Sequence, residues 1–168
     1  MFLGDYFQNI QVTYKKFFFS GISFNSTEIK KNNIFFAIKG NNIDGNDFIS
    51  SAISKGAKII VTEKKINGLK NGILFIQSNN IRKLLAELSF KINKKIPNNI
   101  IAVTGTNGKS SIADFYYQIL DLNNKKVASI GTLGIKTRKY KKNLSNTTID
   151  PIQLSKILNK LKKQNINN

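Results

Sequence analysis

The sequence Ile-Ile-Ala-Val-Thr-Gly-Thr-Asn-Gly-Lys-Ser-Ser at 100–111 combines residue types that can hold a chain of phosphates. Gly105 and Gly108 permit backbone angles, and a close approach of the main chain to a ligand, that a Cβ disfavours. The N–H groups of such a loop and the positive end of the following helix attract an anion. We expect Lys109 to reach the terminal phosphates and Ser110 to offer its hydroxyl to Mg²⁺.

The spacing of this motif departs from the usual G-x-x-x-x-G-K-[ST], because Val103 stands where the first glycine of that pattern belongs. The shorter G-x-x-G-K-S also fits an ordinary strand-turn-helix connection with a solvated lysine. Two flanking patterns favour nucleotide binding: an apolar β-branched run before the loop, and helical periodicity over residues 112–122 after it.

Composition limits the chemistry that the chain can perform. The chain has 168 residues, of which 40% are hydrophobic, so it can bury the core of one medium domain or two small ones. It contains neither cysteine nor histidine, which excludes disulfides, thiolate nucleophiles and imidazole as base or ligand. Acid–base or metal chemistry here must use Asp, Glu, Lys, Ser, Thr or water.

The net charge of +18 suggests a nucleic-acid-binding protein as one alternative. However, the basic residues are spread along the chain, and all of them except Arg82 and Arg138 are lysines. Only arginine makes the bidentate fork that suits phosphate and guanine. Nucleic acid is therefore a distant alternative, whereas attraction for phosphorylated small molecules is compatible with any function.

We expect a cytoplasmic protein that has no membrane partner. No segment approaches the roughly 20 uninterrupted apolar residues of a membrane span. The N-terminus lacks the basic start and apolar stretch of a signal peptide.

Apolar periodicity predicts an α/β fold with a largely parallel sheet. In the first part of the chain, Ile10, Val12 and Tyr14 alternate like a strand, and Asp47 is a candidate helix cap before a stop at Gly56. Further strands are expected at 34–38, 58–62 and 73–76, and a helix at 81–92.

Pro97-Asn98-Asn99 interrupts these patterns, so we predict one domain over 1–96 and a second over 97–168. The second would contain the strand before the glycine loop, the helix after it, a strand at 126–130 and a basic loop through Lys142. Asp150-Pro151 has the form of an N-cap followed by proline at the first helical position. This part is short for a doubly wound nucleotide domain, so we expect it to be incomplete.

The sequence resembles the Mur ligases, ATP-dependent amide-forming enzymes of peptidoglycan precursor synthesis, and most closely the MurE type. Ile34–Gly40 with Asp44-Gly45 is similar to the N-terminal uridine-binding domain of the MurE and MurF types. Val103–Ser110 is similar to the family's short ATP loop, which explains the missing first glycine. Gly131–Gly134 and Asn146–Pro151 resemble a substrate-contacting segment of the central domain.

The resemblance implies a small uridine-binding α/β domain, followed by the start of a P-loop-type parallel-sheet ATPase domain. Its implied ATP-binding residues are Gly105, Thr106, Asn107, Gly108, Lys109, Ser110 and Ser111, with Lys109 catalytic and Ser110 a partial Mg²⁺ ligand. Its implied contacts with UDP-MurNAc-peptide are Phe24, Ser26, Asn41, Asn42, Ile43, Asn146, Thr147 and Thr148. Ser26 and the asparagine pair also suit plain turns, and 146–148 also suits a helix entry.

The chain departs from the family pattern in two respects. Asn25-Ser26-Thr27 stands where the family usually has Asp-Ser-Arg, which affects local support of the uridine site. The family's Mg²⁺-binding Glu and His, its carbamylated lysine and its amino-acid domain have no counterparts in these residues.

The implied reaction adds the third amino acid to UDP-MurNAc-L-Ala-D-Glu through an acyl phosphate, with ATP and Mg²⁺. We expect this chain alone to be inactive because it is truncated. A non-catalytic module that binds a UDP-sugar or nucleotide is the main alternative. The folate-linked glutamate ligases share the ATP loop but lack the N-terminal stretch.

Overall fold

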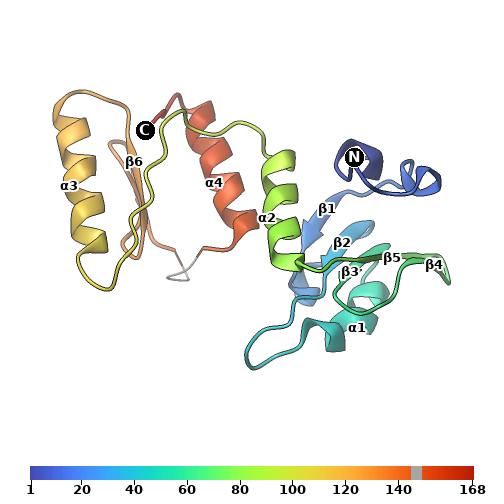
Figure 1. The fold of residues 1–168 in the computed structure, drawn as a ribbon. Coiled ribbons are helices and arrows are strands. Elements are labelled where there is room, and N and C mark those ends of the chain that lie inside the picture. The colour runs from blue at the N-terminus through green and yellow to red at the C-terminus, as the bar shows by residue number, and fades with distance from the viewer. Residues whose placement is uncertain (145–148) are drawn as a thin grey trace. The chain divides into compact units, whose positions relative to one another are not determined.

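The computed structural model describes residues 1–144 and 149–168. They form two compact units, Met1–Ile92 and Asn93–Asn168, which we call the N-terminal and C-terminal units (Figure 1). Each unit has its own sheet and its own helices, and each is described by itself below.

The N-terminal unit is built on a five-stranded sheet in the order β1-β2-β3-β5-β4. Its strands are β1 (Gly21–Ser23), β2 (Asn33–Phe36), β3 (Ile59–Thr62), β4 (Gly68–Lys70) and β5 (Ile73–Gln77). Neighbours among β1, β2, β3 and β5 pair in parallel, and β4 pairs antiparallel with β5. The predicted strands at 34–38, 58–62 and 73–76 are thereby confirmed, as is the α/β class.

Burial explains why these runs form strands. Every residue of β2 and β3 is buried, as expected for parallel strands whose faces are both covered. Phe35, Ile60 and Ile73 belong to the core that Ala52 of helix α1 (Ile49–Ser54) also enters. Helix α2 (Ile81–Ile92) follows β5 and buries Ile81, Leu85 and Leu88, which confirms the predicted helix.

Two local expectations in the N-terminal unit were wrong. Val12–Tyr14 forms a 3-10 turn rather than a strand, and Val12 is 77% exposed, so the alternation of these residues does not reflect a buried face. The helix cap is Asp44 rather than Asp47: its Oδ1 accepts from the N–H of Asn46 at 2.9 Å, and a 3-10 turn (Gly45–Phe48) then leads into α1. An Asx cap lies before the first turn, whereas Asp47 lies within it.

The C-terminal unit contains two long helices and an antiparallel sheet. Helix α3 (Lys109–Leu122) follows the glycine loop, and α4 (Pro151–Lys163) begins after Asp150, which accepts from the N–H of Gln153 as predicted. Strands β6 (Ala128–Gly131), β7 (Gly134–Thr137) and β8 (Lys141–Lys142) pair in sequence order. The stretch expected to be a basic loop is therefore part of a hairpin.

The expected strand before the glycine loop is not formed. Residues 100–104 have no strand partner within the described part of the chain, and Ile100 and Ile101 are more than half exposed. β-branched residues favour an extended chain, but a strand also requires a neighbour that accepts and donates main-chain hydrogen bonds. Within the described residues, the predicted parallel pairing is therefore found in the N-terminal unit, and the paired strands of the C-terminal unit are antiparallel.

Candidate functional site

The glycine loop enters α3 through backbone angles that favour glycine. Gly105 has φ +150° and Gly108, the residue before α3, has φ +76°. A Cβ would meet nothing within 4 Å at Gly108, and only the Asn107 carbonyl oxygen, at 3.7 Å, at Gly105. The backbone angles rather than crowding therefore favour glycine at these two positions. Residues 104–111 are exposed to solvent.

Lys109 folds back over the loop that precedes it. Its Nζ donates to the carbonyl oxygen of Gly105 and to that of Thr106, the latter at 3.0 Å. Both contacts are exposed, so water competes for them. A phosphate placed over the loop would attract this ammonium more strongly than two neutral carbonyls do.

Ser110 contacts a residue that the sequence did not single out. Its Oγ lies 3.1 Å from Oγ1 of Thr132, in the turn between β6 and β7, and either hydroxyl can donate. The only sequence signal for Thr132 was its place in the Gly131–Gly134 stretch. No group of three or more acidic or histidine side chains in the described residues could hold a metal ion. Ser110 suits Mg²⁺ that is held mainly by phosphates and water, as is usual for this ion.

Strand β7 contacts one face of α3 through Lys136. Its Nζ donates to Oδ1 of Asp114 at 2.7 Å and lies 4.5 Å from the centre of the Tyr117 ring. The hydrogen bond from Lys136, aided by one from Gln118, lowers the pKa of Asp114, and the same contact raises the pKa of Lys136. Burial raises the pKa of the Tyr117 phenol. Lys136 is thus a support for the helix that carries the loop.

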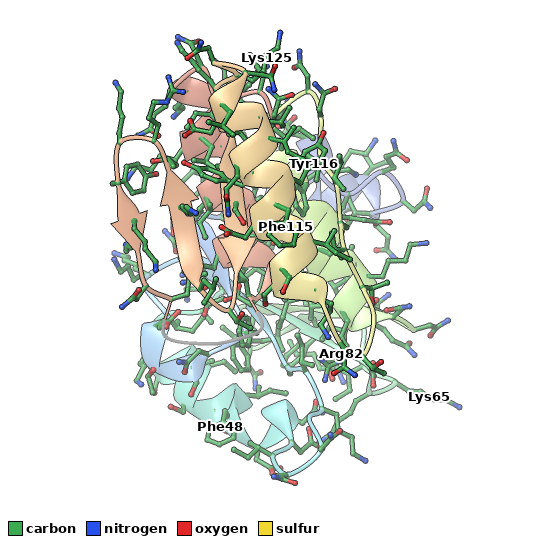
Figure 2. All side chains as sticks on the ribbon, turned by 90° about the vertical axis from the view of Figure 1, so that its left-hand side faces the viewer. Phe48, Lys65, Arg82, Phe115, Tyr116 and Lys125 are labelled. Atoms are coloured by element: carbon green, nitrogen blue, oxygen red, sulfur yellow. The ribbon has the colours of Figure 1, made fainter. Side chains whose placement is uncertain are left out.

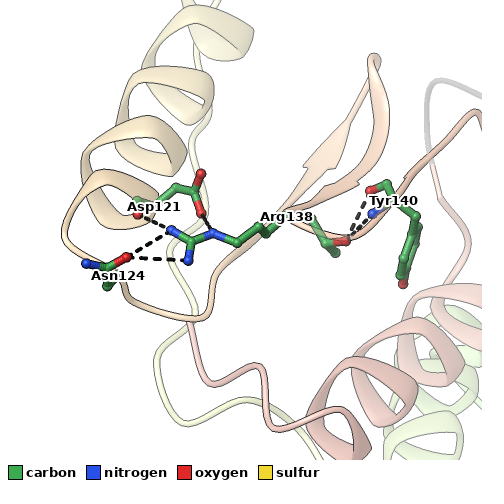
Figure 3. Close-up of polar contacts among 5 residues, drawn as sticks. Asp121, Asn124, Arg138 and Tyr140 are labelled. Carbon is green, nitrogen blue, oxygen red and sulfur yellow. Dashed lines mark hydrogen bonds and ion pairs between the residues drawn. The ribbon is translucent and has the colours of Figure 1, made fainter.

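Arg138 holds the C-terminal end of the same helix (Figure 3). Its Nε donates to Oδ1 of Asp121 at 2.8 Å and its Nη2 donates to the carbonyl oxygen of Asp121 at 2.6 Å. Asn124 accepts two longer contacts, each at 3.4 Å, from the same guanidinium. A cation at the last carbonyls of a helix complements the helix dipole. The guanidinium of Arg138 is therefore occupied by hydrogen bonds to residues of its own unit.

In the N-terminal unit, the predicted uridine contacts follow two adjacent parallel strands. Phe24 comes directly after β1, and residues 41–43 lie in the loop after β2. Ligands of open α/β sheets bind beyond the carboxyl ends of such strands. Phe24 is 40% and Ile43 64% exposed, whereas Ser26 is buried. The topology thus brings these segments to one edge of the sheet.

The departure at Asn25-Ser26-Thr27 has a local explanation. Oδ1 of Asn25 accepts from the N–H of Thr27 at 3.0 Å and from its hydroxyl at 2.9 Å. Asparagine can cap a short helical turn as aspartate does, without the charge. The Asn25–Thr27 pair therefore supports this turn with neutral side chains.

Two polar contacts that the sequence did not reveal steady the loop after β2. The buried Thr62 hydroxyl donates to Oδ1 of Asn46 at 2.7 Å, and Nη2 of Arg82, which is labelled in Figure 2, donates to the carbonyl oxygen of Lys39 at 2.9 Å. Both partners come from elements distant in sequence, so no local pattern could have predicted them. They flank residues 41–43 on both sides.

The remaining predicted substrate contacts, the largest described hollow of the N-terminal unit and the search for membrane-spanning helices do not add to these sites. The predicted contacts Asn146, Thr147 and Thr148 fall outside the described residues. A pocket of about 350 Å³ in the N-terminal unit is lined by Tyr6, Tyr14, Leu84 and others, and none of the predicted uridine contacts lines it. Among the described residues, no helix is both long enough and apolar enough to cross a bilayer.

Comparison with known proteins yields matches along the chain. Residues 19–107 match the family described as "Mur ligase family, catalytic domain", and residues 103–168 match "Mur ligase middle domain". The UDP-N-acetylmuramoyl-L-alanyl-D-glutamate–2,6-diaminopimelate ligase of Rickettsia typhi is 36% identical over 162 residues, which are 94% of this chain and 32% of that protein. The ligase of the same name from Rickettsia conorii is 39% identical over 163 residues, 94% of this chain and 33% of that protein.

A solved structure of a ligase with this name shares the fold. It has a TM-score of 0.80 at 24% identity and covers 99% of this chain and 34% of its own. This chain spans about a third of the length of the curated relatives that it matches. Because one family match alone covers more than half of its residues, the chain belongs to the Mur ligase family.

Proposed function

We propose that these residues are the first part of an ATP-dependent ligase of the MurE type. In this proposal residues 1–96 bind UDP-MurNAc-L-Ala-D-Glu and residues 97–168 contribute half of an ATP site. The observation that supports it most directly is the Gly105–Ser111 loop, in which a positive-φ glycine, a lysine and a serine meet at the start of α3. The relatives' names make 2,6-diaminopimelate the first amino acid to test.

The proposed reaction needs positioning and charge neutralisation more than a protein nucleophile. The substrate carboxylate attacks the γ-phosphate of ATP to give an acyl phosphate, which the incoming amine displaces. Lys109 would leave the Gly105 and Thr106 carbonyls and bind the terminal phosphates. Ser110 would supply one oxygen ligand to Mg²⁺, which neutralises phosphate charge when bound. We propose a cytoplasmic location, where ATP is available.

The proposed uridine site uses the carboxyl edge of the parallel sheet. Phe24 has enough exposed ring to stack on a base, and Asn41 and Asn42 have exposed amides that can bind the uracil or the diphosphate. Ser26 is buried in the 3-10 turn Ser26–Glu28, close in sequence to Phe24. Asn146, Thr147 and Thr148 remain proposed contacts with the peptide portion of the substrate.

Titration calorimetry on four proteins tests the two sites separately. The wild-type chain should bind MgATP and UDP-MurNAc-L-Ala-D-Glu independently. Lys109→Ala should weaken MgATP binding by about tenfold or more, the size expected for one charge-assisted hydrogen bond, and leave UDP-sugar binding unchanged. Phe24→Ala should do the reverse.

Lys125→Ala is the matched control, because Lys125 is an exposed lysine just beyond the opposite end of α3. Equal loss of MgATP binding in Lys109→Ala and Lys125→Ala would contradict the proposed role of Lys109. A non-catalytic binding module predicts the same titrations, but no ADP release once the remaining part of a ligase is supplied.

A further inference from the structure

Residues 39–44, which follow β2, form a tight hairpin with the predicted uridine contacts at its tip. The N–H of Gly40 donates to the carbonyl oxygen of Ile43 at 2.8 Å. Lys39 and Asp44 pair in antiparallel fashion at the base of the hairpin. These bonds give the hairpin its shape, but its direction relative to the sheet depends on contacts with other elements.

The carbonyl of Lys39 points away from the hairpin. In an antiparallel ladder, hydrogen bonds on both sides of a pair leave the main-chain groups of that pair pointing outward. The Lys39–Asp44 pair lies between two such bonds. One is the bond at Gly40, and the other joins the N–H of Gly45 to the carbonyl oxygen of Ile38 at 3.0 Å. The Lys39 carbonyl is therefore available to a donor from another element.

Arg82 of α2, which is labelled in Figure 2, supplies that donor. Its Nη2 donates to the Lys39 carbonyl oxygen at 2.9 Å, across 43 residues of sequence. Lys39 follows β2 and Arg82 follows β5, and β3 lies between these strands in the sheet. Asn80 caps the start of α2, because its Oδ1 accepts from the N–H of Lys83 at 3.0 Å. A capped helix thus holds the outgoing stem of the hairpin through one guanidinium.

A separate series of hydrogen bonds holds the returning stem. Oδ1 of Asp44 accepts from the N–H of Asn46 at 2.9 Å and from its Nδ2 at 2.7 Å. Oδ1 of Asn46 accepts in turn from the buried Thr62 hydroxyl of β3 at 2.7 Å. Side chains therefore anchor the hairpin at two points, to β3 through Thr62 and to α2 through Arg82.

We infer that Arg82 is a positioning residue for nucleotide-sugar binding, because it fixes the direction of the 39–44 hairpin through the Lys39 carbonyl. The inference rests on the proposed function, in which the tip of this hairpin contacts uridine. Without Arg82 the hairpin would be in its binding position for only part of the time. The observed affinity falls by that fraction, because the ligand must then order the hairpin itself.

Binding measurements on variants test this role. Arg82→Met keeps the aliphatic length and removes the donors, so it should weaken binding of uridine and of UDP equally, by about three- to tenfold. NMR titration measures uridine, and calorimetry measures UDP. Arg82→Lys keeps a donor and should recover at least half of the loss. Lys83→Met is the matched control, because Lys83 is the next residue of the same helix and pairs with Glu87.

The two ligands separate positioning from direct phosphate binding, which a guanidinium can also perform. A loss confined to UDP would make Arg82 a phosphate contact and overturn the inference. Wild-type affinities in Arg82→Met, or losses no larger than those in Lys83→Met, would overturn it as well. So would an Arg82→Lys variant that binds as weakly as Arg82→Met.

Hydrogen exchange tests the positioning without a ligand. In Arg82→Met the amides of Gly40 and Gly45 should exchange at least about fivefold faster, because the hairpin opens locally, whereas the amide of Leu74 in β5 should be unaffected. The urea midpoint should change little, because the lost hydrogen bond is exposed. Unchanged exchange at both glycines overturns the inference.

The exchange result also separates this inference from the proposed function. A wild-type chain that binds neither uridine nor UDP contradicts the function, and the amides of Gly40 and Gly45 still decide whether Arg82 holds the hairpin. A chain that binds both ligands, with no change in affinity or exchange in Arg82→Met, contradicts the positioning role alone.

Discussion

The Ser110 and Thr132 hydroxyls lie 3.1 Å apart, so the turn between β6 and β7 reaches the first turn of α3. Lys136 and Arg138, farther along the same hairpin segment, bind Asp114 and Asp121 on the same helix. One short hairpin segment therefore holds the helix at its start, its middle and its end. The position of the glycine loop depends on this hairpin as much as on the loop's own sequence.

Thr132→Val should lower the affinity for MgATP by about two- to fivefold, because the Ser110 hydroxyl loses a partner worth roughly 0.5–1 kcal/mol. Titration calorimetry with and without Mg²⁺ measures it, and the loss should be larger when the ion is present. Thr13→Val, at an exposed position in the N-terminal unit, is the control. An unchanged affinity in Thr132→Val would show that the hydroxyl contact is irrelevant to the bound state.

Gly108→Ala should destabilise the C-terminal unit by about 1 kcal/mol, because an L-residue at φ +76° is strained although there is room for its Cβ. Gly131→Ala is the control: there is likewise nothing within 4 Å of its Cβ, and its φ is not positive. Urea unfolding followed by hydrogen exchange measures the stability of each unit. Identical unfolding of the two variants would contradict the strain argument.

The Asp114–Lys136 pair predicts a stability that depends on pH at both extremes. The pKa of Asp114 lies below its ordinary 3.8, so its contribution is present above that value and is lost as the pH falls through the lowered pKa. The pKa of Lys136 lies above 10.5, so its contribution is complete below that value and is lost as the pH rises through the raised pKa.

Asp114→Asn should therefore lower the melting temperature at pH 7, and its effect should shrink as the pH falls below 3.8 through the lowered pKa of Asp114. Thermal unfolding across pH, with Lys136→Met and the double variant, isolates the coupling of the pair. Asp150, which caps α4, serves as a comparison carboxylate through Asp150→Asn. A deficit in Asp114→Asn that stays constant across pH would show that the ion pair contributes nothing.

Much of the N-terminal unit could be predicted from the sequence because its strands are fully buried. Continuous apolar runs such as residues 34–36 and 59–61 are typical of strands that are buried on both faces. Each of them forms a parallel strand. The contacts that steady the site were not predictable. Thr62 and Asn46, for example, are 16 residues apart and meet only because β3 lies beside β2.

The C-terminal unit illustrates the opposite case. Helix α3 and the Asp150 cap depend on local signals, namely helical periodicity and an Asp-Pro pair, and both were predicted. The run at 100–103 has strong strand propensity and forms no strand, because a strand depends on a partner and propensity does not supply one. The end of the hairpin was mistaken for a loop, since residues 138–142 are mostly basic and β8 is only two residues long.

Gly45→Ala should destabilise the N-terminal unit by about 3 kcal/mol, the upper part of the range for overpacking. Its Cβ would lie 2.5 Å from the carbonyl oxygen and 2.6 Å from the nitrogen of Ile38, and main-chain atoms cannot move aside as a flexible side chain can. The N–H of Gly45 also donates to that carbonyl at 3.0 Å, so the variant would push residues 39–44 away from the sheet edge. Binding of UDP-MurNAc-L-Ala-D-Glu should weaken together with stability.

Gly72→Ala is the matched control. Gly72 has φ +76°, and a Cβ added there would meet nothing within 4 Å. That variant therefore bears backbone strain alone, which costs about 1 kcal/mol. Urea unfolding gives the two stabilities, and titration calorimetry at a temperature where both variants are folded gives the two affinities. Gly72→Ala should bind the UDP-sugar as wild type does. Equal stability of Gly45→Ala and Gly72→Ala would show that the close approach of residue 45 to Ile38 does not hold this loop in place. It would also contradict the proposal that the loop positions Asn41 and Asn42.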